Sequence, residues 1–234
     1  MDVRRVAYCA VAVALLIAVQ YALSFVAGVE LVTVILLCFC YVFGVRCGLL
    51  TATAFSLLRC FIFGFYPAVI ALYLIYFNIF ALIFGLAGKH KTAVWLPPVL
   101  LLLIAVPCAV FATVGVPVSA VYQRRVKVML WILFCISAAI LIFYTVSATL
   151  KRGGGELAAV TALAVYCTVC FTLLDDIITP LFYGFTPDAA AAYFYAGFLS
   201  MLPQTVCAAV SVAALFIPLK KLFSNFGGEK KRRL

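Results

Sequence analysis

The sequence predicts an all-α integral membrane protein, a bundle of helices that crosses the bilayer several times. Of its 234 residues, 68% are hydrophobic and only 10% are charged, and the mean hydropathy is +1.28. A soluble globular domain carries about 25% charged residues, so this composition excludes that class. A helical span needs about 20 apolar residues, which leaves room for about six to eight spans and no separate soluble domain. We therefore expect one membrane domain over residues 1–234.

Four helices are expected in the first part of the chain, at 6–27, 30–43, 49–63 and 68–88. Arg4 and Arg5 precede the first, whose apolar run is too long for a signal peptide and is expected to remain as a span. The run from Glu30 is short, and GVRCG at 44–48 separates it from the next, which indicates a hairpin of two short helices. FGFYP at 63–67 then turns the chain into a full span.

Four more helices are expected after this span, at 95–115, 126–150, 157–179 and 189–219. The first contains Pro97, Pro98 and Pro107, which interrupt its pattern. With the second it forms a predicted extra hairpin over 93–150, and a basic tail at 223–234 follows the last helix. The chain thus has about eight segments.

The distribution of Lys and Arg orients these segments. With the N-terminus inside, most basic residues fall on the cytoplasmic side, where membrane proteins concentrate them. Those expected inside are Arg4, Arg5, Arg46, Lys89, Lys91, Lys151, Arg152, Lys220, Lys221 and the tail; those outside are Arg124, Arg125 and Lys127. Treating 95–115 as a re-entrant loop leaves seven spans and moves five of these basic groups outside, so eight segments and two cytoplasmic termini are preferred.

This orientation gathers polar side chains beneath three outer turns, at 27–30, 64–67 and 180–188. Polar groups in apolar segments are costly and mark functional sites. We predict that one solute pocket is formed by Glu30, Arg59, Tyr73, Asn78, Asp175, Asp176, Tyr183 and Gln204. Gln20 lies at the same level.

Each of these residues also has a structural interpretation. Glu30 is placed to cap a helix, and Arg59 to form an ion pair with Glu30 or with one of the two aspartates. Asn78 and Gln204 are suited to hydrogen bonds between helices, and the tyrosines to an interfacial belt. Composition alone leaves these alternatives open.

The sequence indicates neither catalysis nor a cofactor. It contains no GxxxxGK[ST], HExxH or GxSxG motif, and its one histidine, His90, is expected on a cytoplasmic loop. Cys167 and Cys170 form a CxxC pair in an apolar run without a second pair, so no metal site is expected. The basic residues flank apolar runs and form no basic face, which argues against nucleic-acid binding.

Several motifs, together with their order along the chain, resemble those of the S components of energy-coupling factor (ECF) transporters, the vitamin importers of prokaryotes. They are the small residues Ala10, Ala14 and Ala18 at every fourth position; ELVT followed by FGVRCG; FGFYP followed by an aromatic span ending in GxxGK; and DDIITPLFYGFTP before an aromatic last helix. The resemblance covers about residues 4–91 and 156–222. Val45 stands where the family break usually has Pro, and 93–150 is extra.

The resemblance implies a six-helix core in the cell membrane of a prokaryote that captures a vitamin-like solute from outside. It implies a membrane partner, the T component, which contacts Ala10, Ala14 and Ala18, and two cytosolic ATPases. Small residues at this spacing let another helix approach closely, although the spacing does not say whether that helix is internal. Two other functions stay open: a scaffold without a solute, and a proton-coupled transporter with Asp175 and Asp176 as carriers.

Overall fold

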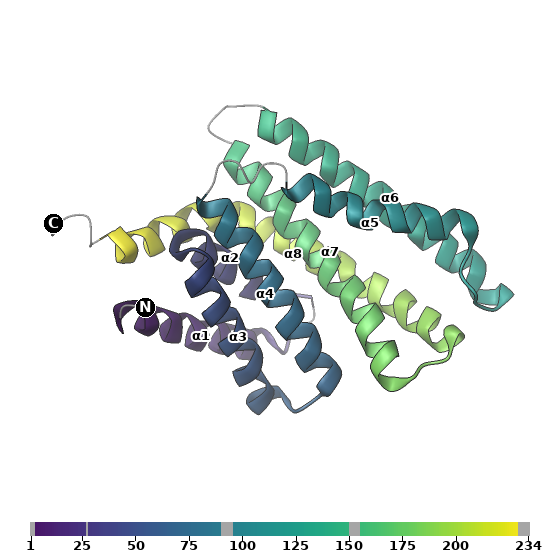
Figure 1. Ribbon diagram of the computed structural model, residues 1–234, viewed down its shortest axis with the longest axis horizontal. Helices are drawn as coiled ribbons and strands as arrows, with labels where there is room; N and C mark the ends of the chain where they lie inside the picture. Colours follow the sequence, from purple (N-terminus) through teal and green to yellow (C-terminus); the bar gives the residue numbers. More distant parts are fainter. Residues whose placement is uncertain (1–2, 27, 90–95, 150–154, 229–234) are drawn as a thin grey trace. The chain divides into compact units, whose positions relative to one another are not determined.

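The computed structural model describes residues 3–26, 28–89, 96–149 and 155–228, and within these ranges all regular secondary structure is helical. Eight α-helices follow one another: α1 (Val3–Leu23), α2 (Val32–Phe43), α3 (Val45–Phe63), α4 (Pro67–Lys89), α5 (Leu96–Val114), α6 (Ala120–Thr149), α7 (Gly155–Tyr183) and α8 (Pro187–Gly228) (Figure 1). The predicted all-α class is confirmed.

Six of these helices, α1, α3, α4, α6, α7 and α8, contain a stretch long and apolar enough to cross a membrane. The helix α2 is shorter, with 12 residues, and the described side chains of α5 give an apolar stretch over Ile104–Val114. Six such helices are those of a multi-pass membrane protein. The side of the membrane on which each end lies stays a prediction.

The chain divides into two compact units, Met1–Ala93 with Val206–Leu234, and Val94–Thr205. We call them the N-terminal unit and the central unit. The long helix α8 contributes to both, because the division falls between Thr205 and Val206.

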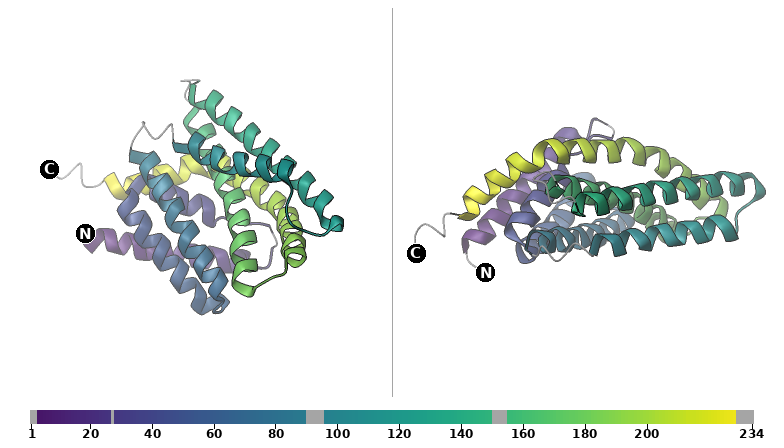
Figure 2. Two further views of the ribbon diagram at one scale, coloured as in Figure 1. Left: turned by 45° about the vertical axis from the view of Figure 1, so that its right-hand side comes forward. Right: turned by 90° about the horizontal axis from the view of Figure 1, so that it is seen from above.

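In the N-terminal unit, α3 and α4 lie side by side as an antiparallel pair, and α2 and α1 pack against them (Figures 1 and 2). Two glycines on α4 allow close packing. A Cβ atom at Gly85 would lie 2.7 Å from the backbone nitrogen of Val45, and one at Gly88 would overlap the carbonyl oxygen of Tyr41. Small residues at such positions let helix backbones approach each other in a membrane.

In the central unit, α5 and α6 form an antiparallel hairpin, and α7 lies along α6 (Figures 1 and 2). The core of this unit is built from Cys108 on α5, Met129 and Leu133 on α6, Val169 on α7, and residues of α8 that include Met201. The turn between α5 and α6 is tied to the start of α8, because the backbone N–H of Ser119 donates to Oδ1 of Asp188 at 2.8 Å. The α5–α6 and α7–α8 turns therefore lie at one end of this unit, as the predicted topology requires.

The break between α2 and α3 is shorter than the sequence predicted. Only Gly44 leaves the helix, with φ of 80°, a conformation that glycine adopts without the strain of a side chain. Residues Val45 to Gly48 form the first turn of α3, which therefore has 19 residues and is a full-length span. The expectation of a second short helix beginning at Leu49 was wrong.

Several helix ends also extend beyond the apolar runs that predicted them. The helix α6 begins at Ala120 instead of 126, α7 ends at Tyr183 instead of 179, and α8 continues to Gly228 instead of 219. These helices continue past the apolar stretches, and neither charged residues nor Pro180 ends them. The predicted cytoplasmic positions Lys91, Lys151, Arg152 and 229–234 lie outside the described residues.

Candidate functional site

The predicted solute residues divide evenly between the two units. Glu30, Arg59, Tyr73 and Asn78 belong to the N-terminal unit, and Asp175, Asp176, Tyr183 and Gln204 to the central unit. Each group is described within its own unit. That all eight line one pocket stays a prediction.

Arg59 is held between two aromatic rings of the N-terminal unit. It lies four residues before the end of α3, about 6 Å along the helix axis. Its guanidinium carbon is 4.1 Å from the centroid of the Tyr73 ring and 4.9 Å from that of Phe63. A desolvated cation–π contact contributes about 2 kcal/mol. The rings thus hold the guanidinium in place without neutralising its charge.

One hydrogen-bond donor of Arg59 is unsatisfied, and no ion pair of Arg59 is formed within the described part of this unit. Its Nε is buried and has no hydrogen-bond partner. Glu30 is the one acidic residue that the structure describes in this unit, and its Oε1 accepts a hydrogen bond from Thr33 Oγ1 at 2.7 Å. The Arg59–Glu30 ion pair that the sequence allowed is therefore not formed.

Gln20 of α1 joins Arg59 through the same tyrosine. Its Nε2 donates to the hydroxyl of Tyr73 at 3.3 Å, while its Oε1 is buried and has no partner. We call Gln20, Arg59, Phe63 and Tyr73 the Arg59 cluster. It combines an unused donor and an unused acceptor beside aromatic rings, drawn from α1, α3 and α4. The sequence placed Gln20 at the right level but did not indicate its contact with Tyr73.

Asn78 has a structural role in the same unit. Its Oδ1 accepts a hydrogen bond from Thr53 Oγ1 at 2.9 Å, and its Nδ2 donates to the carbonyl of Leu74 at 2.8 Å. The first bond joins α3 to α4, as expected for an amide between membrane helices. These internal bonds favour the structural interpretation over solute contact.

Glu30 lies in the turn before α2 and is partly buried. Burial raises the pKa of its carboxyl above the ordinary value, and the hydrogen bond from Thr33 opposes that change. The turn is fixed to α8, because the Glu30 N–H donates to the sulfur of Cys207 and that thiol donates to the Glu30 carbonyl, both at 3.4 Å. Glu30 therefore holds the turn and stays a candidate for solute binding.

The small residues of α1 face away from the rest of the N-terminal unit. Ala10, Ala14 and Ala18 are exposed, whereas Cys9 and Leu16 on the opposite face are buried. The sequence left open whether this face packs internally. Within the described part of the N-terminal unit it does not, so this unit leaves the face open to a partner or to lipid.

In the central unit, the neighbouring carboxylates of α7 have different surroundings. Asp175 accepts hydrogen bonds from Thr179 Oγ1 at 2.7 Å and from Tyr193 OH at 2.8 Å. Both oxygens of Asp176 are buried without a hydrogen-bond partner. They lie against Gly197 of α8, where a Cβ atom would overlap the carboxylate. Asp175 thus joins α7 to α8, whereas the carboxylate of Asp176 is unsatisfied.

The other two candidates of this unit show no such constraint. Tyr183, at the end of α7, is exposed and stacks on Phe185 with ring centroids 6.3 Å apart. Gln204 is partly buried on α8. Their predicted contacts with a solute stay predictions.

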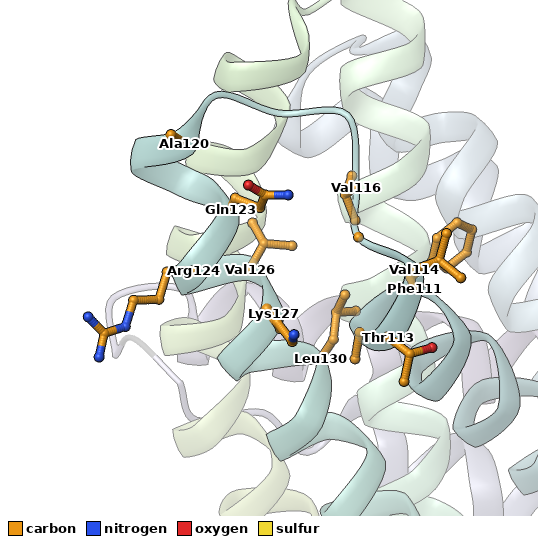
Figure 3. A pocket seen from close by; sticks show the side chains of 12 residues that line it. Phe111, Thr113, Val114, Val116, Ala120, Gln123, Arg124, Val126, Lys127 and Leu130 are labelled. Atoms are coloured by element: carbon orange, nitrogen blue, oxygen red, sulfur yellow. The ribbon is translucent and has the colours of Figure 1, made fainter.

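Two cavities lie in the central unit near the α5–α6 turn. The smaller, of about 310 Å³, is lined by the end of α5, the turn after it and the first turns of α6, where Gln123 points into the opening while Arg124 points away (Figure 3). The larger, of about 650 Å³, is lined by apolar residues of α5 to α8 and by Asp176. Cavities of this size hold small organic molecules.

No family model, curated protein or solved structure matches this chain. The resemblance to ECF S components therefore rests on the motifs of the sequence itself.

Proposed function

We propose that this protein is the substrate-binding S component of an ECF-type importer and captures a vitamin-like solute at the Arg59 cluster. The observation that supports this most strongly is Arg59, a positive charge in a membrane-spanning helix whose buried Nε has no partner. Charged residues in membrane segments are rare and costly, and a buried unsatisfied donor costs about 1–3 kcal/mol. A solute that supplies an acceptor or an anionic group removes this cost.

The chemistry of the cluster suggests the class of solute. The guanidinium donates to carboxylate, phosphate or carbonyl oxygens, and the free Oε1 of Gln20 accepts from an N–H or O–H group. Phe63 and Tyr73 offer aromatic surfaces beside these groups. A compact solute with an acidic or carbonyl group, a nearby donor and a planar part fits this arrangement.

Transport requires partners that supply energy. Binding alone moves nothing, because a solute shifts an equilibrium only by its differential affinity for two states. The sequence lacks a phosphate-binding loop, so two ATPase subunits are proposed as the energy source. The exposed Ala10, Ala14 and Ala18 on α1 would let a T component pack closely against this helix.

The proposal is tested by thermal stability of the purified chain against a panel of vitamins. A binder is stabilised by about 2.7 kcal/mol at a hundredfold excess of solute over its Kd. Arg59→Gln should abolish this stabilisation. Arg46→Gln provides the control, because Arg46 lies on the same helix and is exposed in its first turn.

Two results would overturn the proposal. One is the absence of stabilisation by any vitamin, which would favour a scaffold. The other is accumulation of solute by the purified chain in vesicles without ATP, which would favour a secondary transporter.

A further inference from the structure

Apart from Arg59, the basic residues that the structure describes in the N-terminal unit gather at one end of its helices. They lie at the start of α1, the start of α3, the end of α4 and the last part of α8, and they are Arg4, Arg5, Arg46, Lys89, Lys220 and Lys221. We call these six residues the basic end. All of them are exposed except Lys220, which is partly buried.

Contacts between helices bring four of these residues together around the α2–α3 turn. The Nζ atom of Lys220 lies 5.0 Å from the ring centroid of Tyr41, near the end of α2. The carbonyl of Tyr41 lies against Gly88, the residue before Lys89. Arg46 belongs to the first turn of α3, directly after the same turn. Lys221 follows Lys220 and is exposed, so α3, α4 and α8 present their basic residues at one place.

The start of α1 reaches this place through α8. The hydroxyl of Tyr8, about one helical turn after Arg4 and Arg5, donates to the carbonyl of Phe226 at 3.4 Å. Figures 1 and 2 show the first turns of α1 beside the last turns of α8. The basic end is therefore one surface to which four helices contribute.

No described carboxylate of this unit lies near enough to neutralise the basic end. Glu30 precedes α2, whereas the basic end surrounds the turn that follows α2. A helix of 12 residues is about 18 Å long, and charges in physiological salt are screened beyond about 8 Å. The positive charge of this surface is thus available to an anionic partner.

Exposed apolar side chains continue from the basic end along the same helices. Val6 on α1, Leu86 on α4 and Leu222 on α8 are exposed, and each lies within about one turn of a basic residue. Because α1 and α4 are long and apolar enough to cross a membrane, basic residues at their ends lie at the level of the lipid headgroups. A partner that fits this surface has an anionic group and an apolar part.

We propose that the basic end binds an anionic phospholipid. The guanidinium and ammonium groups donate to phosphate oxygens, and the neighbouring apolar side chains contact the acyl chains. The predicted orientation puts this end on the cytoplasmic side, where the lipid surface is negatively charged. Free phosphate matches the charge but has no apolar part. The site contains no residue of the Arg59 cluster, so it does not rest on the proposed importer function.

The test measures thermal unfolding of the full chain in a neutral detergent with increasing concentrations of three probes. They are dioleoylphosphatidylglycerol, dioleoylphosphatidylcholine with the same acyl chains, and glycerophosphoglycerol, the anionic headgroup without chains. The first should raise the Tm, and the other two should need roughly tenfold higher concentrations or more for the same effect. Added salt should weaken the effect of the first, because it screens exposed charges.

Two double variants locate the binding. Lys89→Gln with Lys221→Gln removes two exposed charges of the basic end and should weaken phosphatidylglycerol binding roughly 30-fold, about fivefold for each charge. Arg124→Gln with Arg125→Gln removes two exposed charges from α6 in the central unit and should bind as the wild type does. If the first double variant does not fold, the three probes and the salt dependence of the wild type decide.

Four outcomes would overturn the inference. They are equal stabilisation by the two lipids, unchanged affinity of the Lys89 and Lys221 variant, equal loss of affinity in both double variants, and a headgroup that stabilises as well as the whole lipid. None of these involves Arg59→Gln or a vitamin, and the vitamin test contains no added lipid. Failure of this site and failure of the proposed function are therefore distinguishable.

Discussion

Replacing aspartate by asparagine should affect stability differently at the two neighbouring carboxylates of α7. Asp175 accepts two hydrogen bonds, from Thr179 and Tyr193, whereas Asp176 accepts none. A hydrogen bond to a charged group contributes about 1.5–3 kcal/mol. An asparagine at 175 keeps one acceptor oxygen but loses the charge and one acceptor site. Asp175→Asn should therefore reduce the free energy of unfolding by about 2 kcal/mol.

At Asp176 the same change removes an unsatisfied charge. The neutral amide loses no hydrogen bond, and its desolvation cost is smaller than that of a carboxylate. Asp176→Asn should leave stability unchanged or raise it by about 1–3 kcal/mol. The substitution is close to isosteric, so the packing against Gly197 is retained.

The assay is thermal unfolding of each purified variant in the same detergent, without added ligand. For a chain of this length about 1 kcal/mol corresponds to about 2–4 °C in Tm, so Asp175→Asn should lower the Tm by about 4–8 °C. Asp176→Asn should not lower it. A similar loss of Tm in both variants would refute the reasoning, because it would show that the Asp176 carboxylate has a stabilising partner.

Three further predictions concern the N-terminal unit. Burial raises the pKa of Glu30 in the folded state above its value in the unfolded state. Its stabilising contribution is therefore present below the unfolded-state pKa and is lost as pH rises through the folded-state pKa. Glu30→Gln should raise the Tm at about pH 8 and not at about pH 4. An equal shift at both values would contradict this. Gly88→Ala places a Cβ atom on the Tyr41 carbonyl. Although alanine has the higher helix propensity, this overlap should lower the free energy of unfolding, measured by denaturation in detergent, by about 1–3 kcal/mol. A gain in stability would exclude the close contact. Ala14→Phe should reduce copurification of a membrane partner and leave the Tm unchanged. Ala139→Phe, on an exposed face of α6, is the control. If both variants retain the partner equally, the small residues of α1 do not contact it.

The sequence located most helices because the length of an apolar run is a local property. It failed where one residue or one hydrogen bond decided the outcome. Gly44 alone makes the break after α2, so four residues assigned to a loop form a helical turn. Pro180 does not end α7, since only one hydrogen bond is lost there.

The candidate site was predicted by residue type and only partly by contact. The Nε of Arg59 and both carboxylate oxygens of Asp176 are buried without hydrogen-bond partners, which is consistent with a binding role. Asn78 and Asp175 belong to the same predicted set, but their hydrogen bonds are satisfied inside their units. Gln20 was not included in that set, because nothing local marks its contact with Tyr73.

The sequence by itself determined that the chain is an all-helical membrane protein and that polar groups lie within its apolar segments. Apolar length and charge distribution carry that information. Only the tertiary structure decided which polar groups are satisfied. Asp175 and Asp176 are adjacent in sequence, yet successive residues on a helix point about 100° apart. One therefore meets Tyr193 of α8 and the other lies without a hydrogen-bond partner against Gly197 of α8, and that difference depends on a helix whose residues are distant in sequence.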